Sequence, residues 1–463
     1  MPSPNHHLNA HVAGTCRSPF APSAGDTIRV RSRRWFLQTG LAGIGGLGLP
    51  DLLRHRTLSA SPTSGNAGKK SVILFWLSGG LSQLDSLDPK PDAPREVKGP
   101  FGTISTRIPG IAFSEHLPLQ ASIADRLSVI RSVDCSASNH TPITMQAGNP
   151  LAQRTNDGKD GAGYPSMGSI AAKFRGANDP DLPAFVGLAE SWRSDVYGAG
   201  HMGSAFEPVK GLELAGKFSL PPGLDLERLE NRKTLRVQFD RLRRQLDHQE
   251  QIAQVDRFTR QAYDMVLSGK VQKAFQLDQE NAETHALYGS CSVGKKALMA
   301  RRLVESGVTF VLVSGAWGYF DHHGDDVRWG GIEKGLKPLL PRIDRALYAL
   351  ITDLEQRGLL QDTLVMMMGE FGRTPVINNQ AGRHHWVNNM SMVVAGGDMP
   401  HGQVIGSSDK RGGSIHSGSV RPQDLAATTF HHLGIAPDTH WIAPSGRPIP
   451  IITENGRLIP ELT

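Results

Sequence analysis

One pattern recurs along this chain and limits its fold: a helix, then a glycine, then a short apolar run. The clearest examples are a helix at 295–305 with Gly307 and an apolar run at 308–314, and a helix at 336–357 with Gly358 and a run at 363–369. Glycine ends helices because it adopts left-handed backbone angles without a steric cost. A continuously apolar run suits a strand that is covered on both faces. The repetition predicts an α/β fold, with a mostly parallel central sheet and helices on both faces.

Further elements follow the same pattern. We expect the first strand at 71–77, ending in Ser78-Gly79-Gly80, where the backbone must turn sharply. A helix at 117–126 leads to a strand at 127–133, and a strand at 390–395 precedes a helix at 422–433. Residues 68–463 are long enough for one large α/β domain with a helical insertion.

That insertion is expected at about 222–285. Residues 224–267 are charged, lack Gly and Pro, and carry Leu, Val and Phe at helical spacing. This composition indicates two long amphipathic helices that form a cap or an inserted hairpin. A coiled-coil contact between two copies of the chain is the alternative interpretation.

Residues 1–67 read as an export signal and linker. Ser32-Arg-Arg-Trp-Phe-Leu-Gln38 precedes a glycine-dotted apolar run at 37–49, which is the pattern of a twin-arginine signal. The run holds 13 residues, whereas a membrane span needs roughly 20. We therefore expect export to the periplasm or beyond the cytoplasm, with contact to the membrane only through this segment.

The charge balance argues against a nucleic-acid partner. The whole chain has 50 basic and 44 acidic residues, and residues 1–67 contribute seven Arg and two acidic residues to these totals. The remainder has 43 basic and 42 acidic residues, a net charge of +1. The excess of positive charge thus belongs mostly to the signal region. The three cysteines form no Cys-x-x-Cys pair, and Cys135 and Cys291 could equally form a disulfide or remain free.

Carboxylate, imidazole and guanidinium groups follow the predicted strands. In open α/β sheets, functional groups gather beyond the carboxyl ends of the strands. Side chains of these kinds occur there at Asp85, His140, Asp321, His323, Glu370 and Arg373, while His384 and His385 precede the strand expected at 390–395. Asp, Glu and His together are the ligands that a divalent metal requires, so the sequence predicts a metal site. An ordinary polar rim with helix caps is the alternative.

These stretches resemble the bacterial "domain of unknown function 1501" family, which belongs to the alkaline phosphatase/sulfatase superfamily. The resemblance covers nearly all of the chain after residue 70. It rests on the following stretches: Leu77-Ser-Gly-Gly-Leu-Ser-Gln-Leu-Asp85, Asp88-Pro-Lys-Pro91, Asn139-His140, Phe320-Asp-His-His-Gly-Asp325, Thr352-Asp-Leu-Glu-Gln-Arg-Gly-Leu-Leu360, Gly369-Glu-Phe-Gly-Arg-Thr-Pro375, Gly382-Arg-His-His-Trp386 and Asp424-Leu-Ala-Ala-Thr-Thr-Phe-His-His-Leu-Gly434.

The resemblance implies a one- or two-metal site that activates a phosphate or sulfate ester. It implies Asp85 as the ligand after the first strand, Asp321 and His323 as an Asp-x-His pair, Glu370 as a later acidic ligand and His385 as the final histidine. His384 stands where the family commonly has Asp, an exchange that favours zinc over calcium or magnesium if this position is a ligand.

The sequence offers more than one candidate for the nucleophile. The sulfatase run Cys-x-Pro-x-Arg does not occur, and Cys135 is followed by Ser-Ala-Ser. Thr141 before Pro142 suits a nucleophile at a helix start, with Ser138 as the alternative and a capping role for Thr141 as another. His140 could be a base, a ligand or a cap. Arg373 could hold an oxyanion or anchor its loop.

From these residues we expect an exported, metal-dependent hydrolase-like protein that acts on a small-molecule or carbohydrate phosphate or sulfate ester. The alternative is a non-catalytic, sulfatase-like binding or assembly module, which the missing sulfatase motif and the change at His384 favour.

Overall fold

The computed structural model describes residues 68–463, apart from 155–159, 191–194, 212–267, 316–317 and 454. The predicted signal at 1–67 and the helices expected at 224–267 therefore lie outside the described residues. Among the described residues, no helix is long and apolar enough to span a membrane. Cys135 and Cys291 are both free thiols.

An eight-stranded sheet forms the centre of the domain, in the order β12-β4-β11-β8-β1-β7-β5-β6. Its strands are β1 (Ser71–Trp76), β4 (Ser128–Val133), β5 (Phe185–Leu188), β6 (Val209–Lys210), β7 (Phe310–Ser314), β8 (Thr363–Met368), β11 (Met390–Gly396) and β12 (Gln403–Ile405). Only β11 runs antiparallel to its two neighbours in this sheet, so the prediction of a mostly parallel sheet is confirmed. The strands β5, β6 and β12 were not predicted, since each is too short to give a clear apolar run.

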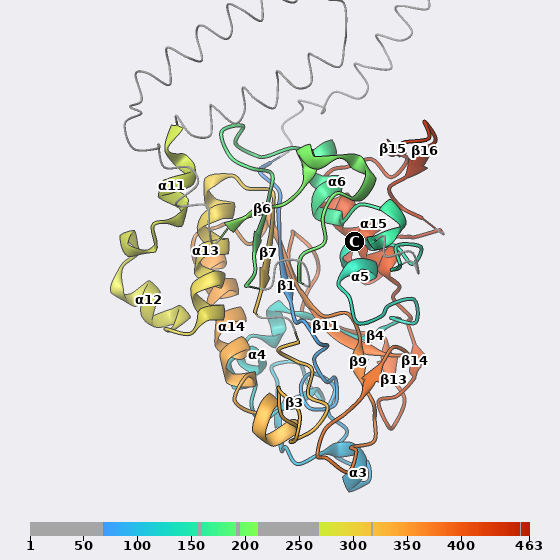
Figure 1. Cartoon of the computed structure of the whole chain (residues 1–463). Helices are drawn as coiled ribbons and strands as arrows, with labels where there is room; N and C mark the ends of the chain where they lie inside the picture. Colours follow the sequence, from blue (N-terminus) through green and yellow to red (C-terminus); the bar gives the residue numbers. More distant parts are fainter. Residues whose placement is uncertain (1–67, 155–159, 191–194, 212–267, 316–317, 454) are drawn as a thin grey trace, which may run out of the picture. The chain divides into compact units, whose positions relative to one another are not determined.

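Helices cover both faces of this sheet (Figure 1). The α-helices of the described residues are α3 (Arg95–Lys98), α4 (Pro118–Ser122), α5 (Ile143–Ala147), α6 (Met167–Phe174), α11 (Lys270–Phe275), α12 (Ala282–Tyr288), α13 (Ser292–Ser306), α14 (Leu340–Gln356) and α15 (Pro422–His432). The predicted helix at 336–357 divides into a π-turn at Ile332–Leu336 and α14. The end of the predicted insertion forms α11 and α12, which pack on α13 and α14.

The strand β1 shows how one apolar run supplies two cores. All six of its residues are buried. Ile73 and Phe75 belong to the core that contains α13 and α14, whereas Leu74 and Trp76 belong to the core beneath α6 and α15. Alternate side chains of a strand point to opposite faces, so a sheet covered on both sides requires this unbroken apolar sequence.

Four short antiparallel ribbons lie outside the central sheet. They pair β2 (Thr103–Ser105) with β3 (Ala112–Ser114), β9 (Gly372–Arg373) with β10 (His385–Trp386), β13 (Ser407–Ser408) with β14 (Ile415–Ser417), and β15 (His440–Ile442) with β16 (Pro448–Pro450). The β9–β10 ribbon matters for the site because it sets His385 directly opposite Arg373.

Candidate metal centre

The loops that carry the candidate side chains meet at one edge of the sheet. Parallel strands β1, β7 and β8 end at this edge, and the residues after them include Gly79, Asp321 and Glu370. The strand β11 runs in the opposite direction, so the residues before it, including His385, reach the same edge. One reversed strand therefore adds a histidine to the loops of the parallel strands.

Asp321 lies at the centre of a group of three histidines. Its Oδ1 is 2.9 Å from Nε2 of His323 and 2.9 Å from Nε2 of His385, and its Oδ2 is 3.4 Å from Nε2 of His140. Ligand atoms of His140, Asp321 and His385 all lie within 4.8 Å of one another. We call these four residues the histidine cluster.

The imidazole rings at this site contact one another through their nitrogen atoms. Nε2 of His323 is 2.9 Å from Nε2 of His385, and Nδ1 of His323 is 3.2 Å from Nδ1 of the exposed His384. A neutral imidazole has one donor and one acceptor nitrogen, so each such contact constrains the tautomers of both rings. Nitrogen lone pairs that converge in this way are the arrangement that a metal ion stabilises.

Burial and charged neighbours shift the pKa values of Asp321, His140 and His385. Burial alone would raise the pKa of Asp321, but hydrogen bonds from His140, His323 and His385, with the Arg373 charge, hold it well below its usual value. Burial opposes the charge on His140, yet the Asp321 and Glu370 carboxylates raise its pKa to about 9. Burial lowers the pKa of His385, an effect that Asp321 partly offsets. In the free protein, His140 thus supplies the positive charge between two carboxylates.

Glu370 connects the cluster to the turn after β1. Its Oε1 accepts hydrogen bonds from the backbone N–H of Gly79 at 2.7 Å and from Nδ1 of His140 at 3.0 Å. Gly79 has φ +98°, and a Cβ atom there would lie 2.5 Å from the backbone nitrogen of Asp321. Only glycine fits this turn, because it provides both the positive φ and the close approach of the two loops.

Arg373 is buried and forms hydrogen bonds with several loops of the site. Its Nη2 lies 2.6 Å from Asp321 Oδ1 and 3.0 Å from the Phe320 carbonyl, and it also donates to the Gly79 carbonyl. Its Nε and Nη1 donate to the carbonyls of Gly80 and Arg383, both at 3.1 Å. These contacts engage all three nitrogens of the guanidinium group within the protein, which favours the anchoring alternative for Arg373.

Asp85 forms a bidentate ion pair with Arg383. Its Oδ2 is 2.7 Å from Nε and its Oδ1 is 3.0 Å from Nη2, while Ser82 Oγ donates to Oδ2 at 2.5 Å. Both side chains are almost fully buried. The structure thus places Asp85 in a structural pair, and the resemblance alone marks it as a ligand. Arg383 was overlooked as its partner, although it belongs to the quoted run Gly382-Arg-His-His-Trp386.

The two candidate nucleophiles lie on the loop beside His140. Thr141 Oγ1 donates to Asn139 Oδ1 at 2.6 Å, and Ser138 Oγ donates to the Asn139 carbonyl at 3.4 Å. The helix α5 starts only at Ile143, with Pro142 as its N-cap and no side-chain cap. The hydrogen bond of Thr141 to Asn139 therefore takes the place of the capping role considered for it.

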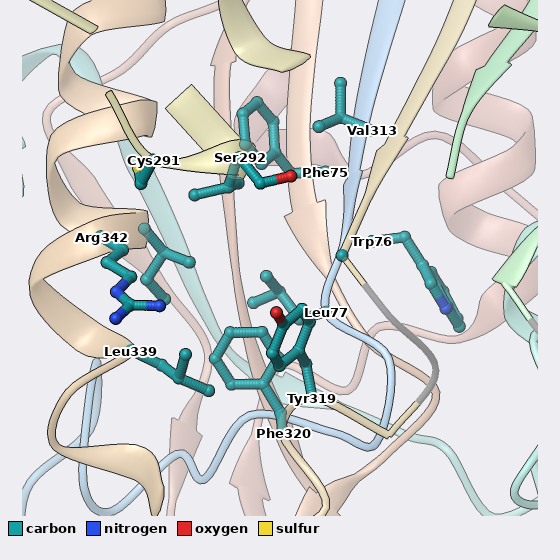
Figure 2. A pocket seen from close by; sticks show the side chains of 13 residues that line it. Phe75, Trp76, Leu77, Cys291, Ser292, Val313, Tyr319, Phe320, Leu339 and Arg342 are labelled. Atoms are coloured by element: carbon teal, nitrogen blue, oxygen red, sulfur yellow. The ribbon is translucent and has the colours of Figure 1, made fainter. Parts of the chain in front are cut away.

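A cavity of about 60 Å³ lies on the α13–α14 side of the sheet edge (Figure 2). Phe75, Leu77, Tyr319 and Phe320 line it, whereas Trp76 points to the opposite side of β1. Its lining includes none of the four residues of the histidine cluster. This mainly apolar cavity is therefore separate from the candidate metal centre, although the loop that forms its floor continues into Asp321.

Comparison with protein families gives one match, which covers the whole described domain. Residues 69–463 match the model of the family described as "Protein of unknown function (DUF1501)". No curated protein sequence matches the chain.

Similar solved structures include three proteins with 11–12% sequence identity to this chain. Ps i-CgsB, in complex with k-i-k-neocarrahexaose, has a TM-score of 0.39 at 12% identity, covering 80% of this chain and 73% of its own. The lipoteichoic acid synthase LtaP from Listeria monocytogenes has a TM-score of 0.38 at 11% identity, covering 86% and 77%. The PsFucS1 sulfatase from Pseudoalteromonas sp. has a TM-score of 0.38 at 12% identity, covering 88% and 76%.

Proposed function

The chain belongs to the DUF1501 family, and from this membership and its histidine cluster we propose that it is an exported, metal-dependent hydrolase of phosphate or sulfate esters. The observation that carries the proposal is the meeting of His140, Asp321 and His385 within 4.8 Å at the carboxyl edge of the sheet. These residues come from three distant parts of the sequence, so their convergence reflects the fold rather than local composition.

The ligand atoms of the histidine cluster suit a divalent ion of borderline softness, such as zinc. Imidazole nitrogens of His140, His323 and His385 surround one carboxylate, which is a combination that zinc prefers, while calcium and magnesium prefer oxygen ligands. Such an ion would supply Lewis-acid polarisation of an ester oxygen. It would also take over the neutralising role that the proton on His140 has in the free protein.

The protein groups around the cluster have separate tasks in this proposal. Glu370 orients His140 through Nδ1, which leaves Nε2 directed to Asp321. Arg373 fixes the position of the Asp321 carboxylate. We assign the attacking hydroxyl to Thr141, the residue next to His140, with Ser138 as the alternative. Asn139 Oδ1 accepts a hydrogen bond from the Thr141 hydroxyl, so the lone pairs of Oγ1 are directed away from Asn139.

Elemental analysis of the full-length protein is the first test. We expect at least one zinc ion per chain in the wild type and its loss in Asp321→Ala and in His385→Ala. His416→Ala is the matched control, because His416 is exposed on β14 and is not part of the cluster. Turnover of p-nitrophenyl phosphate or p-nitrophenyl sulfate should fall at least 100-fold in the two cluster variants and stay unchanged in the control.

The outcomes separate the hydrolase from the binding module. Metal lost from both cluster variants together with turnover supports the hydrolase. Metal binding without turnover of either ester, in wild type and Thr141→Ala alike, supports the non-catalytic module. A folded wild type that takes up no zinc, calcium or magnesium on reconstitution would overturn the metal proposal.

A further inference from the structure

The apolar cavity beside the sheet edge has no role in the proposed hydrolysis. Phe75, Leu77, Val313 and Phe320 form its inner wall, and all four are buried. They come from β1, β7 and the residues that follow these strands, so the central sheet shapes the wall. Because about 10–15 Å³ holds one water molecule, the cavity of about 60 Å³ has room for roughly four to six waters or for one aromatic ring. Its apolar wall favours the ring over water.

The mouth of the cavity lies at the starts of two helices. Ser292 and Val293 are the first two residues of α13, and Arg342 lies in the first turn of α14. Ser292 and Arg342 are exposed, whereas Cys291 and Val293 are half-buried. A ligand can therefore reach the apolar wall from solvent, past these four residues.

A glycine leaves room for one aromatic side chain of the lining. A Cβ atom on Gly315 would lie 2.2 Å from Cδ2 of Tyr319, so a larger residue at position 315 would displace the Tyr319 ring. With Phe75 and Phe320, Tyr319 gives the cavity three aromatic rings. Aromatic rings pack favourably in edge-to-face and offset-stacked arrangements, so this lining suits an aromatic ligand.

Arg342 supplies the positive charge at the mouth. Its guanidinium group points towards the cavity (Figure 2). Within the part of the chain that the structure describes, it forms no ion pair or hydrogen bond. The carboxylate next to the mouth is Glu190, which accepts from Ser292 Oγ at 2.8 Å and is paired with Lys296 Nζ at 3.0 Å. An anion at the mouth would thus meet the Arg342 charge, while the Glu190 charge is already neutralised.

We propose that this cavity binds a small aromatic carboxylate, with its ring against the apolar wall and its carboxylate on Arg342. A guanidinium group matches the geometry of one carboxylate, and its single charge matches a monoanion. A mainly apolar pocket with a few polar groups directed into it is the usual composition of a small-molecule site. The lining contains none of the histidine cluster, so this site does not depend on the proposed hydrolysis.

Benzoate binding to the full-length protein tests this proposal. In an NMR titration we expect a dissociation constant of about 1 mM or lower for benzoate, and binding at least about tenfold weaker for the neutral benzamide. Arg342→Gln should weaken benzoate binding at least about tenfold and leave benzamide binding unchanged. Arg345→Gln is the matched control, because Arg345 lies on the same helix, outside the lining, and its Nε donates to the Leu287 carbonyl at 3.1 Å.

Alkylation of Cys291 gives a second measurement. Cys291 lines the cavity and is half-buried, whereas Cys135 is completely buried. At a benzoate concentration of about five times the dissociation constant, iodoacetamide should modify Cys291 about sixfold more slowly, because only the free protein reacts. Mass spectrometry of the peptide that contains Cys291 gives the rate. The same benzoate concentration should leave the rate in Arg342→Gln nearly unchanged.

Two further variants test where the ring and the carboxylate lie. Val293→Phe should fill the mouth and prevent benzoate binding, whereas Asp321→Ala should bind benzoate as the wild type does. Loss of binding in Asp321→Ala would place benzoate at the histidine cluster and contradict the proposal. A wild type that binds no benzoate, or wild-type affinity in folded Arg342→Gln or Val293→Phe, would also overturn it.

Discussion

At the scale of single residues, two charged groups of the quoted motifs are engaged in buried ion pairs. Asp85 is paired with Arg383, and Arg373 is paired with Asp321 and with carbonyls of three loops. A motif shows which residue types occur at a loop, but it does not show which atoms those residues contact. Both residues therefore need tests that separate stability from metal binding.

Asp85→Asn should destabilise the protein without removing metal from the histidine cluster. The substitution leaves the buried Arg383 charge without its partner, so we expect a loss of about 3 kcal/mol in the free energy of unfolding. Urea unfolding gives the stability, and elemental analysis at a temperature where the variant is folded gives the ion count. A loss of one metal ion per folded chain would contradict this prediction and show that Asp85 is a metal ligand.

Arg373→Lys should destabilise the protein by about 2 kcal/mol or more, because an ammonium group cannot reach carbonyls on three loops from the position of a planar guanidinium. Urea unfolding is again the measurement. Arg411→Lys is the control, since Arg411 is exposed, and its effect should stay within about 0.5 kcal/mol. Similar losses in the two variants would contradict the anchoring role.

At the scale of secondary-structure elements, the turn after β1 organises the site. Gly79 donates its backbone N–H to Glu370, accepts from Arg373 and lies against the backbone of Asp321. The reversed direction of β11 brings His385 to the same edge. The geometry of the cluster thus depends on one glycine turn and on the order and direction of five strands, β1, β4, β7, β8 and β11.

Gly79→Ala should cost clearly more than Gly358→Ala. Both glycines have positive φ, +98° and +69°, but a Cβ on Gly358 meets no atom within 4 Å, whereas one on Gly79 meets Asp321. We expect about 1 kcal/mol for Gly358→Ala from its backbone angles alone and at least about 2 kcal/mol more for Gly79→Ala. Zinc affinity should fall only in Gly79→Ala. Equal unfolding free energies would show that the two loops do not approach so closely.

At the scale of the whole domain, stability against acid depends on groups buried neutral between the sheet and its helices. His432 at the end of α15 contacts the Ser71 carbonyl at the start of β1, with Nε2 at 2.9 Å. Burial lowers the pKa of His432 to about 4, and the Lys70 charge adds to this effect. The unfolded chain binds this proton near pH 6.5. The native contact is therefore fully present above pH 6.5 and loses its effect as the pH falls towards 4.

His432→Gln should flatten this acid dependence. Glutamine can donate to the Ser71 carbonyl but does not titrate, so the stability difference from wild type should shift in favour of the variant by up to about 3 kcal/mol between pH 7 and pH 4. Unfolding free energies in urea at several pH values measure it. His431→Gln, at the exposed neighbouring position, should leave the wild-type slope unchanged. An unchanged slope in His432→Gln would contradict the assignment.

Local patterns in the sequence predicted the class of the fold, and the motifs named the residues that meet in the histidine cluster. Periodic apolar runs and helix-ending glycines predicted β1, β4, β7, β8 and β11, because burial on both faces leaves a local signature in the sequence. The motifs also contained His140, Asp321, His323 and His385. The short strands β5, β6 and β12 gave no such signal, since a few residues take their conformation from the neighbouring strands.

The pairing of charged residues could not be predicted from the sequence and follows from the fold. Asp85 and Asp321 both follow a strand in the sequence, yet one is paired with Arg383 and the other lies among three histidines. Arg342 belongs to none of the quoted motifs, and its place at the mouth of the apolar cavity became visible only in the fold. Strand and helix patterns arise from neighbours along the chain, whereas the Arg373–Asp321 and Arg383–Asp85 ion pairs join residues that are 52 and 298 positions apart.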